Sequence, residues 1–164
     1  MLRSALLGLL ATGLVSLPSV AAHAAPLPEC TNAELVASYR GGDAATSHRF
    51  GRIVLRNTSE QACRIQGYGG LSYVGGHDGT QVGAAATRTP SRTPQVVVRP
   101  GQRVFSPVAE TLAAPYPRRT CRPAHVDGFR VYLPDETRSQ FVPHPTTGCR
   151  NSDVELLAHR AYRS

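Results

Sequence analysis

Four cysteines are the residues of this chain whose type and number point most directly to chemistry: Cys30, Cys63, Cys121 and Cys149. An even number of cysteines in an exported protein is typical of two disulfides. The sequence permits three pairings. We prefer Cys30 with Cys63 and Cys121 with Cys149, because these pairs close local loops. Each disulfide would stabilise the fold by about 3 to 4 kcal/mol, since it restricts the unfolded chain. Zinc is the competing use, but the chain has no Cys-x-x-Cys pair and no suitably spaced histidine.

Histidine and serine patterns do not predict a reactive centre. No two of the histidines after residue 24 lie at i and i+2 or at i and i+4, so no metal site is predicted. Gly70-Leu71-Ser72 begins a nucleophile elbow, but Val74 occupies the position of its final glycine. The five histidines are His48, His77, His125, His144 and His159.

The carboxylate and glycine patterns do not predict a reactive centre either. Asp135 and Glu136 are neighbours in a predicted turn, and neighbouring side chains point apart, so they cannot flank a scissile bond as glycosidase carboxylates do. No glycine-rich phosphate loop precedes a helix. We therefore expect no catalytic, cofactor-binding or metal-binding residue, no cofactor, and a protein that is not an enzyme.

Positive charge comes from arginine alone: the chain has 18 arginines and no lysine. Without Arg3, seventeen arginines and eleven acidic residues leave a net charge of +6. Such a chain can attract nucleic acid, acidic polysaccharide or anionic lipid. The tight group is Arg118, Arg119 and Arg122, a possible anion contact, but no aromatic residues alternate with the arginines as single-strand binding requires. A GC-rich genome would also produce an arginine-only composition.

The N terminus has the pattern of a secretory signal peptide. Arg3 precedes a mostly apolar run, residues 5–15, and Ala22-His23-Ala24 offers small residues for cleavage after Ala24. The run is shorter than the roughly 20 residues of a spanning helix. We expect residues 1–24 to be removed and residues 25–164 to form one domain, secreted or associated with the cell envelope, with no membrane span.

The central prediction is a β-hairpin over residues 52–66. Side chains alternate across a strand, so Ile53 and Leu55 face inward while Arg52, Val54 and Arg56 face outward. The polar turn 57–60, which contains a glycosylation triplet at Asn57-Thr58-Ser59, leads to a second strand with Cys63 and Ile65 inward. Two such strands joined closely predict antiparallel pairing.

Other short strands predict an antiparallel sandwich. A flexible loop is expected at 41–47, a mobile polar loop at 86–94, and an extended connection at 113–123. Pro107 indicates an edge strand or a bulge. Short strands separated by turns, without a long helix, favour an all-β sandwich. The further strands begin near residue 34 and cover 71–74, 81–85, 95–99, 102–111, 129–133, 139–142 and 155–158.

A set of short motifs occurs in a fixed order along the chain. They are Leu55-Arg56-Asn57-Thr58-Ser59, Cys63, Gly67-Tyr68-Gly69-Gly70-Leu71, Arg99-Pro100-Gly101, Cys121-Arg122-Pro123-Ala124, Leu133-Pro134-Asp135-Glu136 and Cys149. Their order and spacing resemble the domain of unknown function 4232 family of exported proteins from high-GC Gram-positive bacteria. The resemblance covers most of residues 30–160 and implies an immunoglobulin-like β-sandwich with no established activity.

Three functions remain open from the sequence. The first is a secreted, non-enzymatic module that binds an unidentified protein or polymer of the envelope or medium through the 75–79 tip or the 86–94 loop. The second is a binder of an anionic polymer, wall polymer or nucleic acid, through Arg118, Arg119 and Arg122 together with strand arginines. The third is a secreted hydrolase whose residues are dispersed in sequence.

Overall fold

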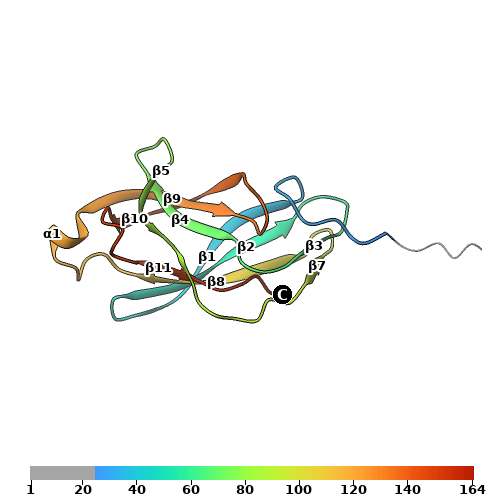
Figure 1. The fold of residues 1–164 in the computed structure, drawn as a ribbon, viewed down its shortest axis with the longest axis horizontal. Helices are drawn as coiled ribbons and strands as arrows, with labels where there is room; N and C mark the ends of the chain where they lie inside the picture. The colour runs from blue at the N-terminus through green and yellow to red at the C-terminus, as the bar shows by residue number, and fades with distance from the viewer. Residues whose placement is uncertain (1–24) are drawn as a thin grey trace, which may run out of the picture.

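The computed structural model describes residues 25–164, so the predicted signal peptide and its cleavage site lie outside the described residues. The described chain is built from strands, with one short helix, and most of the strands form two sheets that face each other (Figure 1). The all-β prediction is therefore confirmed. No helix among these residues is long and apolar enough to cross a membrane.

The larger sheet has five strands in the order β1, β2, β8, β11, β6. Its neighbours pair antiparallel, except that β6 runs parallel to β11. Strand β8 therefore lies in the middle of the sheet. The bounds are β1 Leu35–Ala45, β2 His48–Asn57, β6 Thr87–Arg88, β8 Arg103–Thr111 and β11 Leu157–His159.

The second sheet has four antiparallel strands in the order β10, β9, β4, β5, and a separate small sheet pairs β3 with β7. The helix, α1, lies at one end of the molecule in Figure 1, and β3 and β7 lie at the other. The bounds are β3 Cys63–Ile65, β4 Gly70–Gly75, β5 Thr80–Ala85, β7 Val96–Val98, β9 Pro123–Tyr132, β10 Ser139–Cys149 and α1 Arg118–Cys121.

The hydrophobic core fills the space between the two main sheets. Strand alternation turns every second side chain inward, and burial of large apolar side chains is the main favourable contribution to folding. Ile53, Leu55 and Val104 enter from the five-stranded sheet, and Phe129 and Val131 from the four-stranded sheet, each at most 1% exposed. The predicted inward positions of β2 are confirmed.

The predicted hairpin over residues 52–66 is wrong, although both of its strands exist. Strand β2 pairs with β1 and β8, and β3 pairs with β7. Asn57 explains the difference, because its buried side chain donates to the carbonyl oxygens of Gln61 and Val98, both at 2.8 Å. These bonds stabilise a turn that leads from the large sheet to β3, which pairs with β7, instead of folding the chain back along β2.

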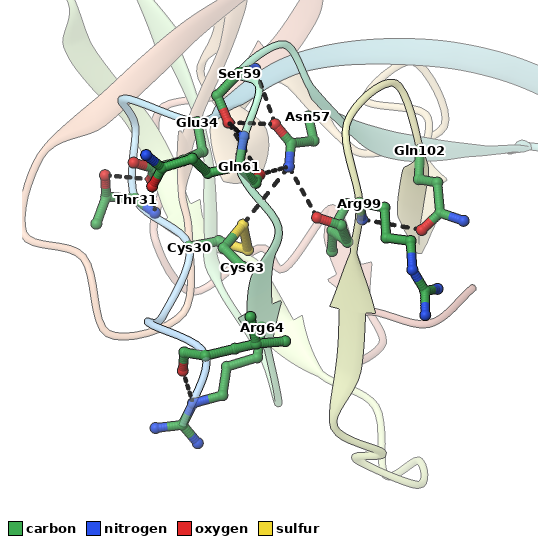
Figure 2. The surroundings of a disulfide bond; sticks show 12 residues. Cys30, Thr31, Glu34, Asn57, Ser59, Gln61, Cys63, Arg64, Arg99 and Gln102 are labelled. Atoms are coloured by element: carbon green, nitrogen blue, oxygen red, sulfur yellow. Dashed lines mark hydrogen bonds between the residues drawn. A yellow bond between two sulfur atoms is a disulfide. The ribbon is translucent and has the colours of Figure 1, made fainter. Parts of the chain in front are cut away.

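Figure 2 shows Asn57 beside the Cys30–Cys63 disulfide. The Asn57 amide nitrogen lies 4.0 Å from the Cys63 sulfur, and its oxygen accepts from the backbone and hydroxyl of Ser59, each at 2.9 Å. The Asn57 side chain is therefore a buried structural element and not an accessible glycan acceptor. The two preferred pairings, Cys30 with Cys63 and Cys121 with Cys149, are both confirmed.

Three further expectations are corrected. The predicted 41–47 loop is largely strand, since β1 continues to Ala45 with a bulge between Gly41 and Ala44. Residues 113–123 contain α1 rather than a purely extended connection. Pro107 lies in the interior strand β8, where the Ser106 hydroxyl donates to the Arg160 carbonyl at 2.5 Å. That carbonyl faces the nitrogen of Pro107, so the hydroxyl compensates for the N–H that proline lacks.

Candidate binding surface

The outward side of β1, β2 and β8 carries a cluster of exposed cationic side chains, which we call the arginine face. It consists of Arg40 from β1, Arg52 and Arg56 from β2, Arg103 from β8, and Arg163 near the C terminus. The alternation that buries Ile53 and Leu55 turns their neighbours in β2 toward solvent.

Strand register arranges these residues in three rows across the sheet. The two outer rows each place two arginines directly opposite each other on neighbouring strands, and the middle row is extended by Arg163, which pairs with Phe105. Neighbouring strands lie about 4.8 Å apart, and positions two residues apart on one strand are about 6.6 Å apart. The rows are Val36, Arg56 and Arg103, then Ser38, Val54 and Phe105, then Arg40, Arg52 and Pro107.

Like charges directly opposite each other destabilise a sheet. Within the described residues, the arginines that form ion pairs are Arg49, with Glu110, and Arg64, with Glu29, and neither belongs to the arginine face. The repulsion between Arg40 and Arg52, and between Arg56 and Arg103, is therefore not offset by a carboxylate in the described part of the chain. A bound anion would offset it.

Phe105 orders two of these arginines. The Arg52 guanidinium lies 5.4 Å from the ring centroid and that of Arg163 lies 5.1 Å from it. The C-terminal segment is held here by two backbone hydrogen bonds between Phe105 and Arg163, at 2.8 and 3.0 Å. A hollow of about 230 Å³ lies beside the ring and is lined by Arg40, Arg52, Val54, Arg103 and Phe105.

The structure separates the predicted arginine group from the arginine face. Arg118 and Arg119 lie in α1 and Arg122 follows it directly, all of them exposed. Arg103 begins β8, whereas α1 comes after the far end of that strand, whose nine residues extend roughly 25 to 30 Å. This group therefore does not form one site with the strand arginines of the arginine face.

The 86–94 segment differs from the mobile polar loop that the sequence predicts. Its short strand β6 pairs with β11, and Thr89 donates its N–H to the His159 carbonyl at 2.9 Å. The Tyr68 hydroxyl donates to the Thr89 carbonyl at 2.9 Å and accepts from the Ser91 N–H at 2.8 Å. Its polar groups are used to fix the backbone against the sheet.

The 75–79 tip is fastened to β9 through Asp127. The His77 N–H donates to Asp127 Oδ2 at 2.7 Å, and the rings of His77 and His125 approach Oδ1 at 3.5 and 3.3 Å. Asp78 Oδ1 accepts from the Thr80 N–H at 2.9 Å and so closes the turn. Among the described residues, no group of three or more His, Cys, Asp or Glu side chains is arranged to hold a metal ion.

A second feature, a buried polar cluster, lies between the sheets and centres on Glu110, whose side chain is fully buried. Tyr39 donates to Glu110 Oε1 at 2.7 Å and Tyr73 donates to Oε2 at 2.5 Å. His144 Nε2 lies 2.9 Å from Oε2, and Arg49 Nη2 lies 3.3 Å from it. Strands of both sheets therefore meet at one carboxylate.

The surroundings of Glu110 keep it ionised. Burial opposes its charge, but the hydrogen bonds from His144, Tyr73 and Tyr39 outweigh burial and lower its pKa below the ordinary value of 4.5. Burial and the neighbouring carboxylate raise the pKa of Tyr39 and of Tyr73 well above 10. These tyrosines thus remain neutral donors, and the cluster joins the sheets rather than providing a base.

A buried Ser–His contact lies elsewhere in the core. Ser106 Oγ is 3.3 Å from His159 Nδ1, but this hydroxyl donates to the Arg160 carbonyl. Burial, together with the charge of Arg88, lowers the pKa of His159 to about 4. Both side chains are at most 4% exposed, so the serine oxygen has no open approach for a substrate.

Sequence reasoning did not identify the arginine face or the Glu110 cluster. The inward position of Glu110 could have been recognised, because it is in phase with Val104, Ser106 and Val108 along β8. The arginine face could not, because Arg40, Arg52 and Arg103 come together only through the pairing of β2 with both β1 and β8.

The fold and the surface define a disulfide-bonded, all-β protein with a cationic sheet face. The family model of a domain of unknown function, DUF4232, matches residues 30–160. The chain belongs to this family, as the sequence motifs indicate. No curated protein and no solved structure matches it.

Proposed function

We propose that this protein is a secreted, non-enzymatic, immunoglobulin-like β-sandwich module that binds an anionic ligand of the cell envelope or extracellular medium through its arginine face. The observation that carries the proposal is that Arg40 lies opposite Arg52 and Arg56 lies opposite Arg103, and none of the four forms an ion pair with a carboxylate of residues 25–164. An arrangement that costs stability in the free protein is explained if a ligand supplies the missing negative charge.

Two further observations favour a ligand site over a merely solvated surface. Phe105 holds the guanidinium groups of Arg52 and Arg163, so less conformational freedom is lost when they bind an oxyanion. The hollow beside Phe105 allows an anion to contact several guanidinium groups at once. Planar guanidinium groups bind carboxylates, phosphates and sulfates with two parallel hydrogen bonds.

The buried groups support binding over catalysis. The Ser106 hydroxyl donates to a backbone carbonyl, and the Glu110 carboxylate accepts from four neighbouring side chains. Export is supported by the signal-peptide pattern, with cleavage after Ala24, and by two disulfides, which form in oxidising compartments.

Salt-dependent binding to an immobilised carboxylated polymer tests the proposal. The exported chain should be retained at low salt and released as salt rises, because retention releases counterions. Replacement of Arg40, Arg52 and Arg103 by Ala should abolish retention. Replacement of Arg118, Arg119 and Arg122 by Ala removes the same net charge but should leave most of the retention.

Equal losses in the two triple variants would mean that net charge alone causes retention, and the proposed site would be wrong. Circular dichroism and thermal unfolding of both variants establish that each is folded. We expect the arginine-face variant to unfold at a slightly higher temperature than the parent, because it relieves like-charge repulsion.

A further inference from the structure

The outward side of the five-stranded sheet changes from cationic to apolar along β8. We propose that it binds a single anionic amphiphile, with the acidic headgroup on the arginine face and the alkyl chain on the apolar part. This inference rests on the proposed function and specifies its ligand. Beyond Arg52 and its partner Pro107, the next row of outward residues on β2, β8 and β11 is apolar and consists of Phe50, Ala109 and Ala158.

Two hollows meet at this apolar row. One, of about 240 Å³, extends toward Pro107, and the other, of about 330 Å³, extends toward Thr111. The three residues of the row line both hollows, so together the hollows form one groove along β8, which we call the apolar groove. Its ends, at Pro107 and Thr111, are four residues apart, which corresponds to about 13 Å.

The apolar groove continues from the hollow of the arginine face. Phe105, Pro107 and Ala109 are alternate residues of β8, so they face the same side of the sheet. Phe105 lines the hollow that is bounded by arginines, and the other two line the apolar groove. A ligand that lies along β8 can therefore contact guanidinium groups at one end and apolar side chains at the other.

The shape of the groove suits an alkyl chain. Pro107, Ala109 and Ala158 give it a floor of small side chains, and Phe50, which is 43% exposed, lies on the β2 side. The backbones of β2 and β11 are two strand spacings apart, about 10 Å, which is no wider than a helix with its side chains. A single chain fits this width, and a hollow receives a chain rather than inserting into a bilayer.

Charges at the two ends of the groove orient such a ligand. At the end near Pro107, Arg52 lies directly opposite and Arg160 lines the hollow. At the other end, Glu155 lines the hollow, and Asp43 lies in the bulge of β1 nearby. An acidic headgroup is attracted by the arginines and repelled by the carboxylates, so the alkyl chain extends toward Glu155.

Isothermal titration with ionised alkanoates, below the concentrations at which they form micelles, tests the inference. The probes are acetate, hexanoate, octanoate and decanoate, with octyl glucoside as an uncharged amphiphile. Affinity should rise about 2- to 3-fold with each added methylene group, because each one buries more apolar surface in the groove. Octyl glucoside should bind about 10-fold more weakly than octanoate, because it lacks the charge that the arginines bind.

Two variants separate the apolar groove from the arginine face. Ala109→Gln places a longer, polar side chain on the floor of the groove, so it should weaken decanoate binding about 10-fold and leave retention on the carboxylated polymer unchanged. Ala85→Gln, at an exposed position of β5 in the other sheet, is the matched control and should change neither. Replacement of Arg40, Arg52 and Arg103 by Ala should weaken both. Circular dichroism establishes that each variant is folded.

The outcomes separate this inference from the proposed function. If affinity does not rise with chain length while polymer retention still depends on the arginine face, the proposed function stands and the amphiphile is wrong. If Ala109→Gln and Ala85→Gln affect decanoate binding equally, the groove is not its site. If the arginine-face substitutions change neither decanoate binding nor polymer retention, both the site and its ligand are wrong.

Two further probes test other occupants. If vesicles of anionic phospholipid retain the protein and decanoate does not bind, the sheet contacts a membrane surface and this inference is overturned. If an extended peptide of alternating glutamate and leucine binds more tightly than decanoate, the partner is a protein segment and the inference is likewise overturned.

Discussion

The Tyr73 hydroxyl of β4 donates a 2.5 Å hydrogen bond to the Glu110 carboxylate of β8, and this bond joins the four-stranded sheet to the five-stranded sheet inside the core. Tyr39 and His144 add contacts from β1 and β10 at 2.7 and 2.9 Å. A buried carboxylate is costly unless its oxygens are fully paired. The cluster therefore makes the position of the two sheets depend on a small set of polar contacts.

Removal of the Glu110 charge should destabilise the fold. Glu110→Gln replaces a charged acceptor by a neutral amide among donors that suit only a carboxylate, with an expected cost of about 1 to 3 kcal/mol in the free energy of unfolding. Urea denaturation measures it, and Glu155→Gln at an exposed position is the matched control with no expected effect. A cost below about 0.5 kcal/mol for Glu110→Gln would contradict a structural role for the cluster.

Gly51 is required because Tyr39 passes directly over it. A Cβ at position 51 would lie 2.3 Å from the Tyr39 hydroxyl oxygen, whereas a Cβ at Gly41, directly opposite, would meet Tyr39 only at an ordinary 4.0 Å. Gly51→Ala should displace the ring from Glu110 and destabilise the protein by about 2 to 3 kcal/mol. Gly41→Ala should change stability by less than about 1 kcal/mol.

Thermal unfolding of Gly51→Ala in a Tyr39→Ala background distinguishes this steric explanation from a general backbone effect. The double variant should lose less stability than the two single variants lose together, because Tyr39→Ala removes the atoms that the new methyl group meets. Full additivity would show that Tyr39 is not the cause.

Stability should rise with pH between about 4 and 6.5 because of His159. Burial lowers its pKa from 6.5 to about 4, so the unfolded chain takes up this proton at a higher pH than the folded chain does. Its contribution is complete above pH 6.5 and declines as the pH falls toward 4, by up to about 3 kcal/mol. Urea denaturation at several pH values in this range should show that the free energy of unfolding of His159→Phe depends much less on pH, whatever its absolute stability.

Glu110 acts in a lower pH range. Its folded pKa lies below 4.5, so its contribution is present above that value and is lost as the pH falls through the folded pKa. Glu110→Gln should therefore leave the slope between pH 4.5 and 6.5 intact. The His48→Gln variant, at an exposed position, serves as the histidine control. If His159→Phe left the pH dependence of the free energy of unfolding between pH 4 and 6.5 unchanged, His159 would not be its cause.

Asn57 should be more important than its exposed neighbour in the same turn. Asn57→Ala removes two 2.8 Å hydrogen bonds to the carbonyls of Gln61 and Val98 and leaves both acceptors without this donor. The expected cost is about 2 to 4 kcal/mol in chemical denaturation, whereas Thr58→Ala, at an exposed position, should cost less than about 0.5 kcal/mol. Equal effects of the two substitutions would contradict the anchoring role of Asn57.

The sequence predicts the local features of this fold well. The alternation around Ile53 and Leu55 follows from strand geometry, and the Cys30–Cys63 and Cys121–Cys149 pairings follow from the preference for short loops. These features depend on residues that are near one another in the chain. The hairpin over residues 52–66 failed because the Asn57 side chain turns inward, and turn composition alone does not show this.

The candidate site depends on long-range pairing and was not predicted. Arg40 meets Arg52 because β1 folds back on β2, and Arg56 meets Arg103 because β2 pairs with a strand more than forty residues later. Alternation predicts that Arg52 and Arg56 face solvent, but it does not predict which residues stand opposite them. The group at Arg118, Arg119 and Arg122 was conspicuous only because its members are close in sequence.

The central claim is that the arginine face is the binding surface, and chemical-shift mapping tests it most directly. A titration of the isotope-labelled exported chain with an oligomer of a carboxylated polymer should shift the Val54 methyl signals and the Nε–Hε signals of Arg40, Arg52 and Arg103. Signals from the 75–79 tip and from α1 should remain in place. Shifts confined to that tip or to the arginines at 118, 119 and 122 would contradict the account.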